Sequence, residues 1–308
     1  MMRTHRLIAL FGGLALLTAT ALPGRADPLT KINVSYSMTS DFLPALVAKD
    51  TGIFEKHGLD VTLSSLATTS LAPPALQAGS LQIASLSPPL LLLANDGGLD
   101  LVAVSNVAWL DKNDPHSSLI TRTGLTVTKA QDLIGKRIGR PGINSAIDVL
   151  LKKWLLDRGI KLDQVTIVET PFNQMGDLLR AGQVDAVVAL EPIMSRIIAS
   201  GVGVKSVDFI SEVNPRIAAA IFGATRDWAN ANRAHVHAFR DALTEAMAFM
   251  KSHPKETDEI QQKRLGFVAT PADLALDLGP ADFDFWIDAL RQLKLLQQSA
   301  DATKLILN

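Results

Sequence analysis

The sequence predicts a mixed α/β fold made of two lobes. Short apolar strands alternate with amphipathic helices from Lys31 to Ala224, as in parallel sheets covered by helices. The length of 308 residues favours two domains over one. Several predicted strands end in Ser, Thr or Asn, and ligands of open α/β sheets bind beyond the carboxyl ends of the strands. We therefore expect two α/β domains, with a polar ligand cleft at the carboxyl ends of the strands.

The first lobe is expected to take up residues 27–117. Beyond its last strand, Trp109–Pro115 is predicted to be a loop, and a strand at Ser118–Arg122 carries the chain onward. Helices fill the gaps between the expected strands, which lie at Lys31–Tyr36, Leu59–Leu63, Gln82–Ser87 and Leu99–Val104.

The second lobe is expected at residues 118–217, and the chain then returns to the first lobe for residues 218–308. Ala218–Ala224 would make the return, and the chain from Asp227 onward is expected to be helical. Ala234–His253 has the clearest helical stripe of apolar residues in this part. Strands of the second lobe are expected at Lys136–Gly139, Val165–Glu169, Ala186–Leu190 and Val207–Ser211.

The first 26 residues have the pattern of a secretory signal peptide. Arg3 and Arg6 make a basic start, Leu7–Leu17 is apolar, and Gly24-Arg25-Ala26 places small residues before a cleavage point. This apolar run is shorter than the roughly 20 residues that span a membrane. The chain contains no cysteine, which excludes disulfides, thiolate metal ligands and a lipid-bearing cysteine. We expect an exported, freely soluble protein.

Composition and motifs exclude several classes of function. The formal net charge is -1 and no basic cluster occurs, so nucleic acid is not an expected partner. The sequence lacks a G-x-S-x-G elbow, a phosphate-binding loop, a dinucleotide motif after a strand and an H-E-x-x-H zinc motif. His235 and His237 stand two apart on a helix and point to different sides. We expect no cofactor, no metal site and no catalytic residues.

One helix start has the features of an anion site. A short strand ends at Arg140, a turn of Pro and Gly follows, and Asn144 and Ser145 open an amphipathic helix. Free N–H groups and the helix dipole favour an anion at such a start, and Arg140 could add a bidentate charge. The alternative is an ordinary N-cap beside a solvated arginine.

Four segments in order resemble the periplasmic solute-binding proteins of ABC importers for sulfonates, taurine, nitrate and thiamin precursors. They lie behind the predicted signal peptide and are spread over most of the remaining chain. The resemblance implies a type II periplasmic-binding-protein fold, in which two α/β lobes close around a ligand. The segments are LVAKDTGIFEKHGLDV (Leu46–Val61), ALQAGSLQIASLSPP (Ala75–Pro89), DLIGKRIGRPGINSA (Asp132–Ala146) and LLRAGQVDAVVALEP (Leu178–Pro192).

The resemblance also implies which residues contact the ligand. Two of them are acids: Asp41 could instead cap a helix, and Glu191 could instead end a strand facing water. Trp109 is a further candidate, because its indole could stack on a flat ligand. By position in the family pattern, the ligand groups come from Ser40, Asp41, Thr68, Thr69, Ser70, Ser85, Ser87, Asn144, Ser145, Ala146 and Glu191.

The expected function is that of an extracytoplasmic, periplasmic solute-binding protein. It would capture a small organic anion or zwitterion, such as a sulfonate or carboxylate, and deliver it to a membrane ABC permease with its ATPase. A monomer without enzymatic activity is expected. Two alternatives stay open at this point. They are an enzyme of thiamin-pyrimidine or cofactor-biosynthesis type on the same fold, and a ligand sensor for a membrane kinase.

Overall fold

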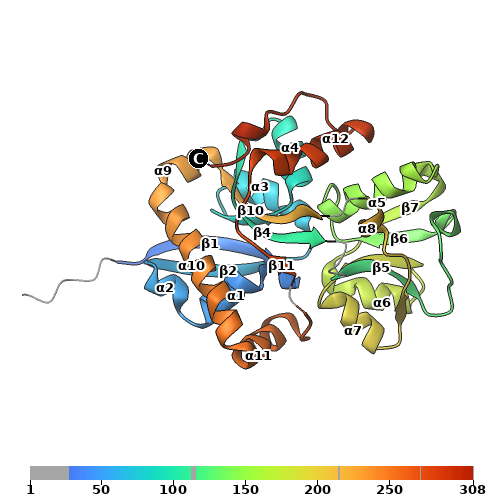
Figure 1. Cartoon of the computed structure of the whole chain (residues 1–308), viewed down its shortest axis with the longest axis horizontal. Coiled ribbons are helices and arrows are strands. Elements are labelled where there is room, and N and C mark those ends of the chain that lie inside the picture. The colour runs from blue at the N-terminus through green and yellow to red at the C-terminus, as the bar shows by residue number, and fades with distance from the viewer. Residues whose placement is uncertain (1–27, 112–115, 214–215, 271, 308) are drawn as a thin grey trace, which may run out of the picture.

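A computed structural model describes residues 28–111, 116–213, 216–270 and 272–307 (Figure 1). The predicted signal peptide lies outside these residues. Within them the chain forms three sheets, which separate into two lobes. The first lobe holds a two-stranded and a four-stranded sheet, and the second lobe holds one five-stranded sheet.

The first lobe begins with a parallel pair of strands. Strands β1 (Thr30–Ser37) and β2 (Leu59–Leu66) pair in register from Thr30 opposite Leu59. A parallel bridge from Val34 to Ile83 leads toward the second sheet of this lobe. The other early elements are η1 (Ser40–Phe42), α1 (Leu43–Asp50), α2 (Ile53–Lys56), η2 (Thr69–Leu71), α3 (Ala72–Gln77), β3 (Ala84–Leu86), α4 (Pro88–Asp96) and β4 (Leu101–Asp111).

The second lobe has a sheet with the strand order β7-β6-β8-β5-β9. Strands β6, β7 and β8 run parallel, while β5 is antiparallel to both of its neighbours. Its elements are β5 (Ser117–Arg122), η3 (Ala130–Leu133), β6 (Arg137–Arg140), α5 (Ala146–Asp157), η4 (Leu162–Gln164), β7 (Thr166–Glu169), η5 (Phe172–Gln174), α6 (Met175–Arg180), β8 (Ala186–Leu190), α7 (Ile193–Ala199), β9 (Gly203–Lys205) and α8 (Phe209–Val213).

The last part of the chain completes the first lobe. Strand β10 (Arg216–Thr225) lies between β4 and β3 in the order β11-β4-β10-β3. Helices then cover this lobe, as the orange and red ribbons of Figure 1 show. They are α9 (Arg226–Ala231), α10 (Arg233–Ser252), α11 (Pro254–Leu265) and α12 (Asp284–Gln292), with the short elements β11 (Asp273–Leu274), η6 (Pro280–Phe283) and η7 (Ala302–Lys304) among them.

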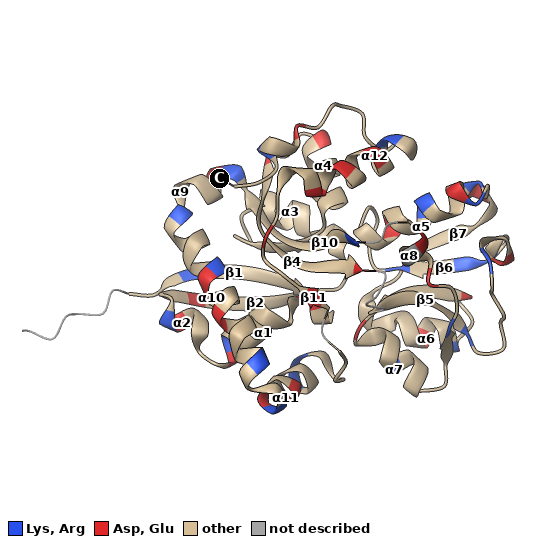
Figure 2. Cartoon of the chain, viewed as in Figure 1, with Lys and Arg blue, Asp and Glu red and all other residues tan. Residues whose placement is uncertain are grey.

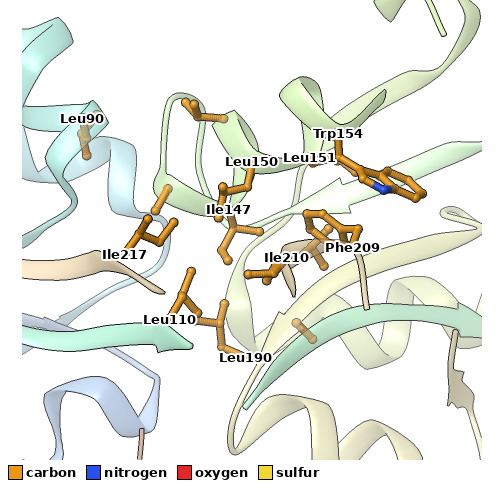
Figure 3. Close-up of a cluster of buried hydrophobic side chains, with 14 of the residues drawn as sticks. Leu90, Leu110, Ile147, Leu150, Leu151, Trp154, Leu190, Phe209, Ile210 and Ile217 are labelled. Atoms are coloured by element: carbon orange, nitrogen blue, oxygen red, sulfur yellow. The ribbon is translucent and has the colours of Figure 1, made fainter. Parts of the chain in front are cut away.

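An apolar core continues from one lobe into the other. Leu110 and Ile217, at the ends of β4 and β10, belong to the same buried cluster as Ile147 and Leu190 of the second lobe (Figure 3). Helices α4 and α12 of the first lobe also contact α5 of the second. Charged residues lie mainly on the outer helices, while the central strands are largely uncharged (Figure 2). The lobes are therefore joined by packed apolar side chains as well as by the chain itself.

Three expectations about elements were wrong. Trp109 was placed in a loop, but β4 extends to Asp111 because β10 and β11 both pair with this stretch. Val207–Ser211 was predicted as a strand, but β9 ends earlier and α8 begins at Phe209, whose ring packs 5.5 Å from that of Trp154. Residues after Asp227 were expected to be all helical, yet β11 adds a short edge strand.

No helix in the described part of the chain is both long enough and apolar enough to cross a membrane.

Candidate functional site

A cavity of about 490 Å³, part of it open to solvent, lies between the two lobes. The part of it that water can occupy is about 50 Å³, which is room for a few water molecules. Its walls come from the ends of β1, β3, β4 and β8, from β10 and from the start of α5. The cavity in this conformation therefore suits a small ligand.

The start of α5 forms one wall of the cavity. Ser145 is the N-cap, and its hydroxyl accepts a hydrogen bond from the N–H of Asp148 at 3.3 Å. The N–H of Ala146 donates to the Ser87 hydroxyl of the first lobe at 3.2 Å. The cavity is lined here by Ser87, Ser145, Ala146 and Ile147, while Asp148 lies outside the lining. The positive end of this 12-residue helix is thus directed at the space between the lobes.

Trp109 lines the cavity with an indole N–H that has no hydrogen-bond partner. The side chain is about 9% exposed, so water does not readily replace that partner. The guanidinium carbon of Arg216 lies 4.0 Å from the centroid of the indole ring and covers one face of it. Trp109 can therefore offer a hydrogen-bond donor at its edge, because an indole nitrogen donates and never accepts.

Asp41 adds a buried carboxylate to the wall of the cavity. One oxygen, Oδ2, accepts a hydrogen bond from the Thr39 hydroxyl at 3.0 Å. The other, Oδ1, has no hydrogen-bond partner and lies 3.4 Å from Nε2 of His116. Asp41 is 5% exposed and belongs to the 3₁₀ turn η1, directly after β1. His116 is not among the residues predicted to contact the ligand, because β4 was not predicted to extend as far as Asp111.

The rest of the wall is apolar or weakly polar. Among the described residues that line the cavity there is no lysine and no arginine. Besides the residues already named, the lining consists of Ser37, Phe42, Thr69, Leu86, Ala108, Leu110, Pro141, Phe172, Leu190, Ala219 and Ala220.

Arg140 does not line the cavity. Its Nε donates to Asp148 Oδ1 at 3.0 Å, and its Nη1 donates to Glu169 Oε2, also at 3.0 Å. Asp148 is fully buried and accepts two further bonds, from the Asn144 N–H at 2.8 Å and from Lys152 Nζ at 2.6 Å. We call Arg140, Asp148, Lys152 and Glu169 the α5 network. It holds the turn before α5, and ligand contact by Arg140 stays a prediction that this geometry does not favour.

Glu169 connects the α5 network to the first lobe. Its Oε1 accepts a hydrogen bond from the Ser70 hydroxyl at 2.6 Å, and Oε2 also accepts the N–H of Ile143 at 3.0 Å. Burial alone would raise the pKa of Glu169, but hydrogen bonds from Ser70, Thr68, Ile143 and Arg140 outweigh it and lower that pKa. The ionised carboxylate therefore stabilises contact between the lobes.

Backbone hydrogen bonds also join the two lobes beside Glu169. The N–H of Thr69 donates to the carbonyl of Pro141, and the N–H of Phe172 donates to that of Ala67, each at 3.3 Å. Gly142 lies so close to Thr69 that a Cβ on it would stand 2.1 Å from the Thr69 hydroxyl. The lobes are therefore in a closed arrangement.

Glu191 also lies outside the cavity lining. Its carboxylate accepts bonds from the N–H and the hydroxyl of Ser195, at 3.1 and 2.7 Å, in the first turn of α7. Its backbone carbonyl accepts the N–H of Ser40 from the first lobe at 2.8 Å. Glu191 thus joins the lobes through its backbone, and ligand contact by its carboxylate stays a prediction.

The structure brings together about half of the residues predicted from the sequence. The cavity lining contains Asp41, Thr69, Ser87, Trp109, Ser145 and Ala146. The others lie behind it: Ser85 accepts from Ser37, Asn144 belongs to the turn before α5, and Ser40 has a buried hydroxyl without a partner. Thr68 and Ser70 bond each other and Glu169. No group of three or more possible metal ligands occurs in the part of the chain described.

The fold and the cavity define a class: two α/β lobes, crossed twice by the chain, with a ligand-sized space between them, which is the periplasmic-binding-protein fold. Residues 39–257 match the family model described as NMT1/THI5 like. Because this match covers most of the chain, the protein belongs to the NMT1/THI5-like family.

Known proteins agree with this placement. A candidate binding protein of Brucella abortus is 27% identical over 220 residues, which are 71% of this chain and 66% of that protein, just under two thirds of its length. The alkanesulfonate-binding protein SsuA of Xanthomonas axonopodis, bound to MOPS, has a TM-score of 0.74 at 18% identity, covering 91% of this chain and 98% of its own. The periplasmic nitrate-binding protein NrtA of Synechocystis has a TM-score of 0.74 at 15% identity, covering 89% and 84%. At these identities the solved structures establish the fold alone.

Proposed function

We propose that this protein is a periplasmic solute-binding protein that captures a small organic anion or zwitterion and delivers it to a membrane ABC permease with its ATPase. The observation that carries the proposal is the closed cavity between the lobes, with buried polar atoms that have no partner. Trp109 Nε1 and Asp41 Oδ1 are two of them. Buried polar groups are normally bonded, so such atoms in a cavity mark the places of ligand atoms.

The acceptor end of the ligand would lie between α5 and Trp109. Hydroxyls of Ser87 and Ser145, the positive end of the helix dipole and the Trp109 indole N–H all favour an oxygen that carries partial or full negative charge. This recognition would need no arginine, in contrast to a fork from Arg140.

A binding role without catalysis fits the wall of the cavity. The hydroxyls of Ser87 and Ser145 bond N–H groups of α5, at Ala146 and Asp148, which fits a role in holding the helix start that faces the ligand. We further propose that the lobes comprise residues 27–117 with 218–308 and residues 118–217, and that the protein works as a monomer. Two proteins of the same fold, named as an alkanesulfonate-binding protein and a periplasmic nitrate-binding protein, support this role.

A thermal-shift screen tests the proposal. Small sulfonates, carboxylates and amino acids are added to the purified mature protein, and a binder raises the melting temperature by mass action. Isothermal titration then gives the Kd, and a co-purified ligand is identified by mass spectrometry of the denatured protein. If no small organic solute raises the melting temperature and none co-purifies, the proposal is wrong.

A further inference from the structure

We infer that the ligand carries a protonated nitrogen that pairs with Asp41, so that the site selects amines over the matching simple anions. The inference rests on the proposed function and deepens it by naming the ligand class. It depends on charge, burial and unsatisfied bonding at Asp41 alone.

The carboxylate of Asp41 lies in the cavity wall and is almost fully buried. A buried carboxylate is costly unless a cation or several donors compensate it. The Thr39 hydroxyl satisfies Oδ2, while Oδ1 has no donor. A ligand N–H that reaches Oδ1 would supply the missing bond.

The protein itself supplies little positive charge at this place. No lysine or arginine is among the described residues that line the cavity. Two arginines close to the wall in the chain pair with other acids: Arg140 with Asp148 and Glu169, and Arg216, which also covers the Trp109 ring, with Asp273 at 2.9 Å. His116 is the one basic side chain in the described lining, and its Nε2 forms an ion-pair contact with Oδ1 at 3.4 Å without a hydrogen bond. Oδ1 of Asp41 therefore still lacks a hydrogen-bond donor, which a ligand N–H would supply.

The cavity wall presents both hydrogen-bond donors and an unsatisfied acceptor. Trp109 and the start of α5 present donors, so they require an acceptor such as a carboxylate or sulfonate oxygen. Asp41 presents an acceptor, so it requires a donor. A ligand with only negative charge would leave Oδ1 unsatisfied and would be repelled by it. A small zwitterion would satisfy the donors of Trp109 and α5 and the acceptor of Asp41 at once.

Two matched pairs of probes test the inference: β-alanine with propionate, and 2-aminoethanesulfonate with ethanesulfonate. Each pair differs by one amine, and each Kd is measured by isothermal titration on the mature wild-type protein at pH 7. We expect the amine to tighten binding by about tenfold or more in at least one pair, which is the effect of one charge-assisted hydrogen bond. Equal or tighter binding of both amine-free members overturns the inference and leaves the proposed function standing.

Variants make the assignment to Asp41 specific. In Asp41→Asn, which keeps the shape and removes the charge, the advantage of the amine should fall by about tenfold and so largely disappear. Asp163→Asn, an exposed change on the far part of the second lobe, should retain it. An amine advantage that persists in Asp41→Asn overturns the inference. If neither member of either pair binds and no other solute from the screen does, the proposed function itself fails.

Discussion

The α5 network and the cavity wall adjoin at the start of α5, yet they differ in how completely their polar groups are hydrogen-bonded. In the network, Asp148 accepts bonds from Arg140, Asn144 and Lys152. In the wall, Trp109 Nε1 and Asp41 Oδ1 have no hydrogen-bond partner. The difference teaches that a buried charge does not by itself mark a ligand site. The incompletely bonded groups are the better guide, since a saturated network has nothing left to offer a ligand.

The largest expected effect comes from breaking the α5 network. Asp148→Ala leaves the buried guanidinium of Arg140 with one partner fewer, and we expect the free energy of unfolding to fall by about 3–5 kcal/mol. Denaturant unfolding measures it. The matched control on the same helix is Asp157→Ala, whose exposed pair with Lys153 should contribute at most about 0.5 kcal/mol. A loss below about 1 kcal/mol for Asp148→Ala would contradict the structural role of the network.

Closure of the lobes should be the next most sensitive feature. A Cβ in Gly142→Ala would meet the Thr69 hydroxyl, so the lobes would stop short of the closed position and the Kd of a bound solute should rise about tenfold or more. Titration calorimetry measures the change, and small-angle scattering of the complex reports the incomplete closure.

A double-mutant cycle provides the control for this contact. Thr69→Ala removes the clashing hydroxyl, so Gly142→Ala should cost less affinity in that background than in the wild type. The same loss in both backgrounds would show that Gly142 affects binding by another route.

A smaller effect is expected at Trp109. Trp109→Phe removes a donor that has no partner in the protein, so stability should change by less than about 1 kcal/mol. Binding should weaken by about 0.5–1.5 kcal/mol, because the ligand oxygen loses that hydrogen bond. Unfolding and titration experiments on the one variant separate the two quantities. Unchanged affinity together with lower stability would place Trp109 with the structural residues.

The smallest effect is the pH dependence of the contact that Glu169 makes between the lobes. Because the closed structure lowers the pKa of Glu169, its contribution is fully present above the ordinary glutamate pKa of about 4.3 and is lost as pH falls through the lower value of the closed form. The melting temperature of the ligand complex should therefore fall less steeply toward acid in Glu169→Gln than in the wild type. If the melting temperature falls equally steeply with pH in both proteins, Glu169 does not stabilise the closed arrangement.

Much of the fold could be predicted because many of its elements depend on residues close together in the sequence. Ser145 as the N-cap of α5 and the buried strand Ala186–Leu190 need only neighbouring residues to be recognised. The length of β4 and the helical α8 could not be predicted in this way, since distant partners decide them. Trp109 is held in β4 by Ala218 and Asp273, more than a hundred residues further along the chain.

The site shows the same division. The polar strand ends and the helix start led to Ser87 and Ser145, whose positions follow from the order of the elements. The pairing of Arg140 with Glu169 could not be predicted, because Glu169 stands opposite it on the neighbouring strand and this register is not visible in either segment alone. His116 was missed for a related reason, as its place beside Asp41, which lies far earlier in the chain, is decided by tertiary structure.

Because no lysine or arginine is among the described residues that line the cavity, the site should also discriminate against inorganic anions. Chloride, phosphate and sulfate compete with an organic anion for any pocket that is lined by lysine or arginine. The carboxylate of Asp41 repels these ions, and the described lining holds no lysine or arginine to attract them. We expect the binding of its solute to be nearly insensitive to added sulfate, so that rejection of common inorganic ions is built into the site.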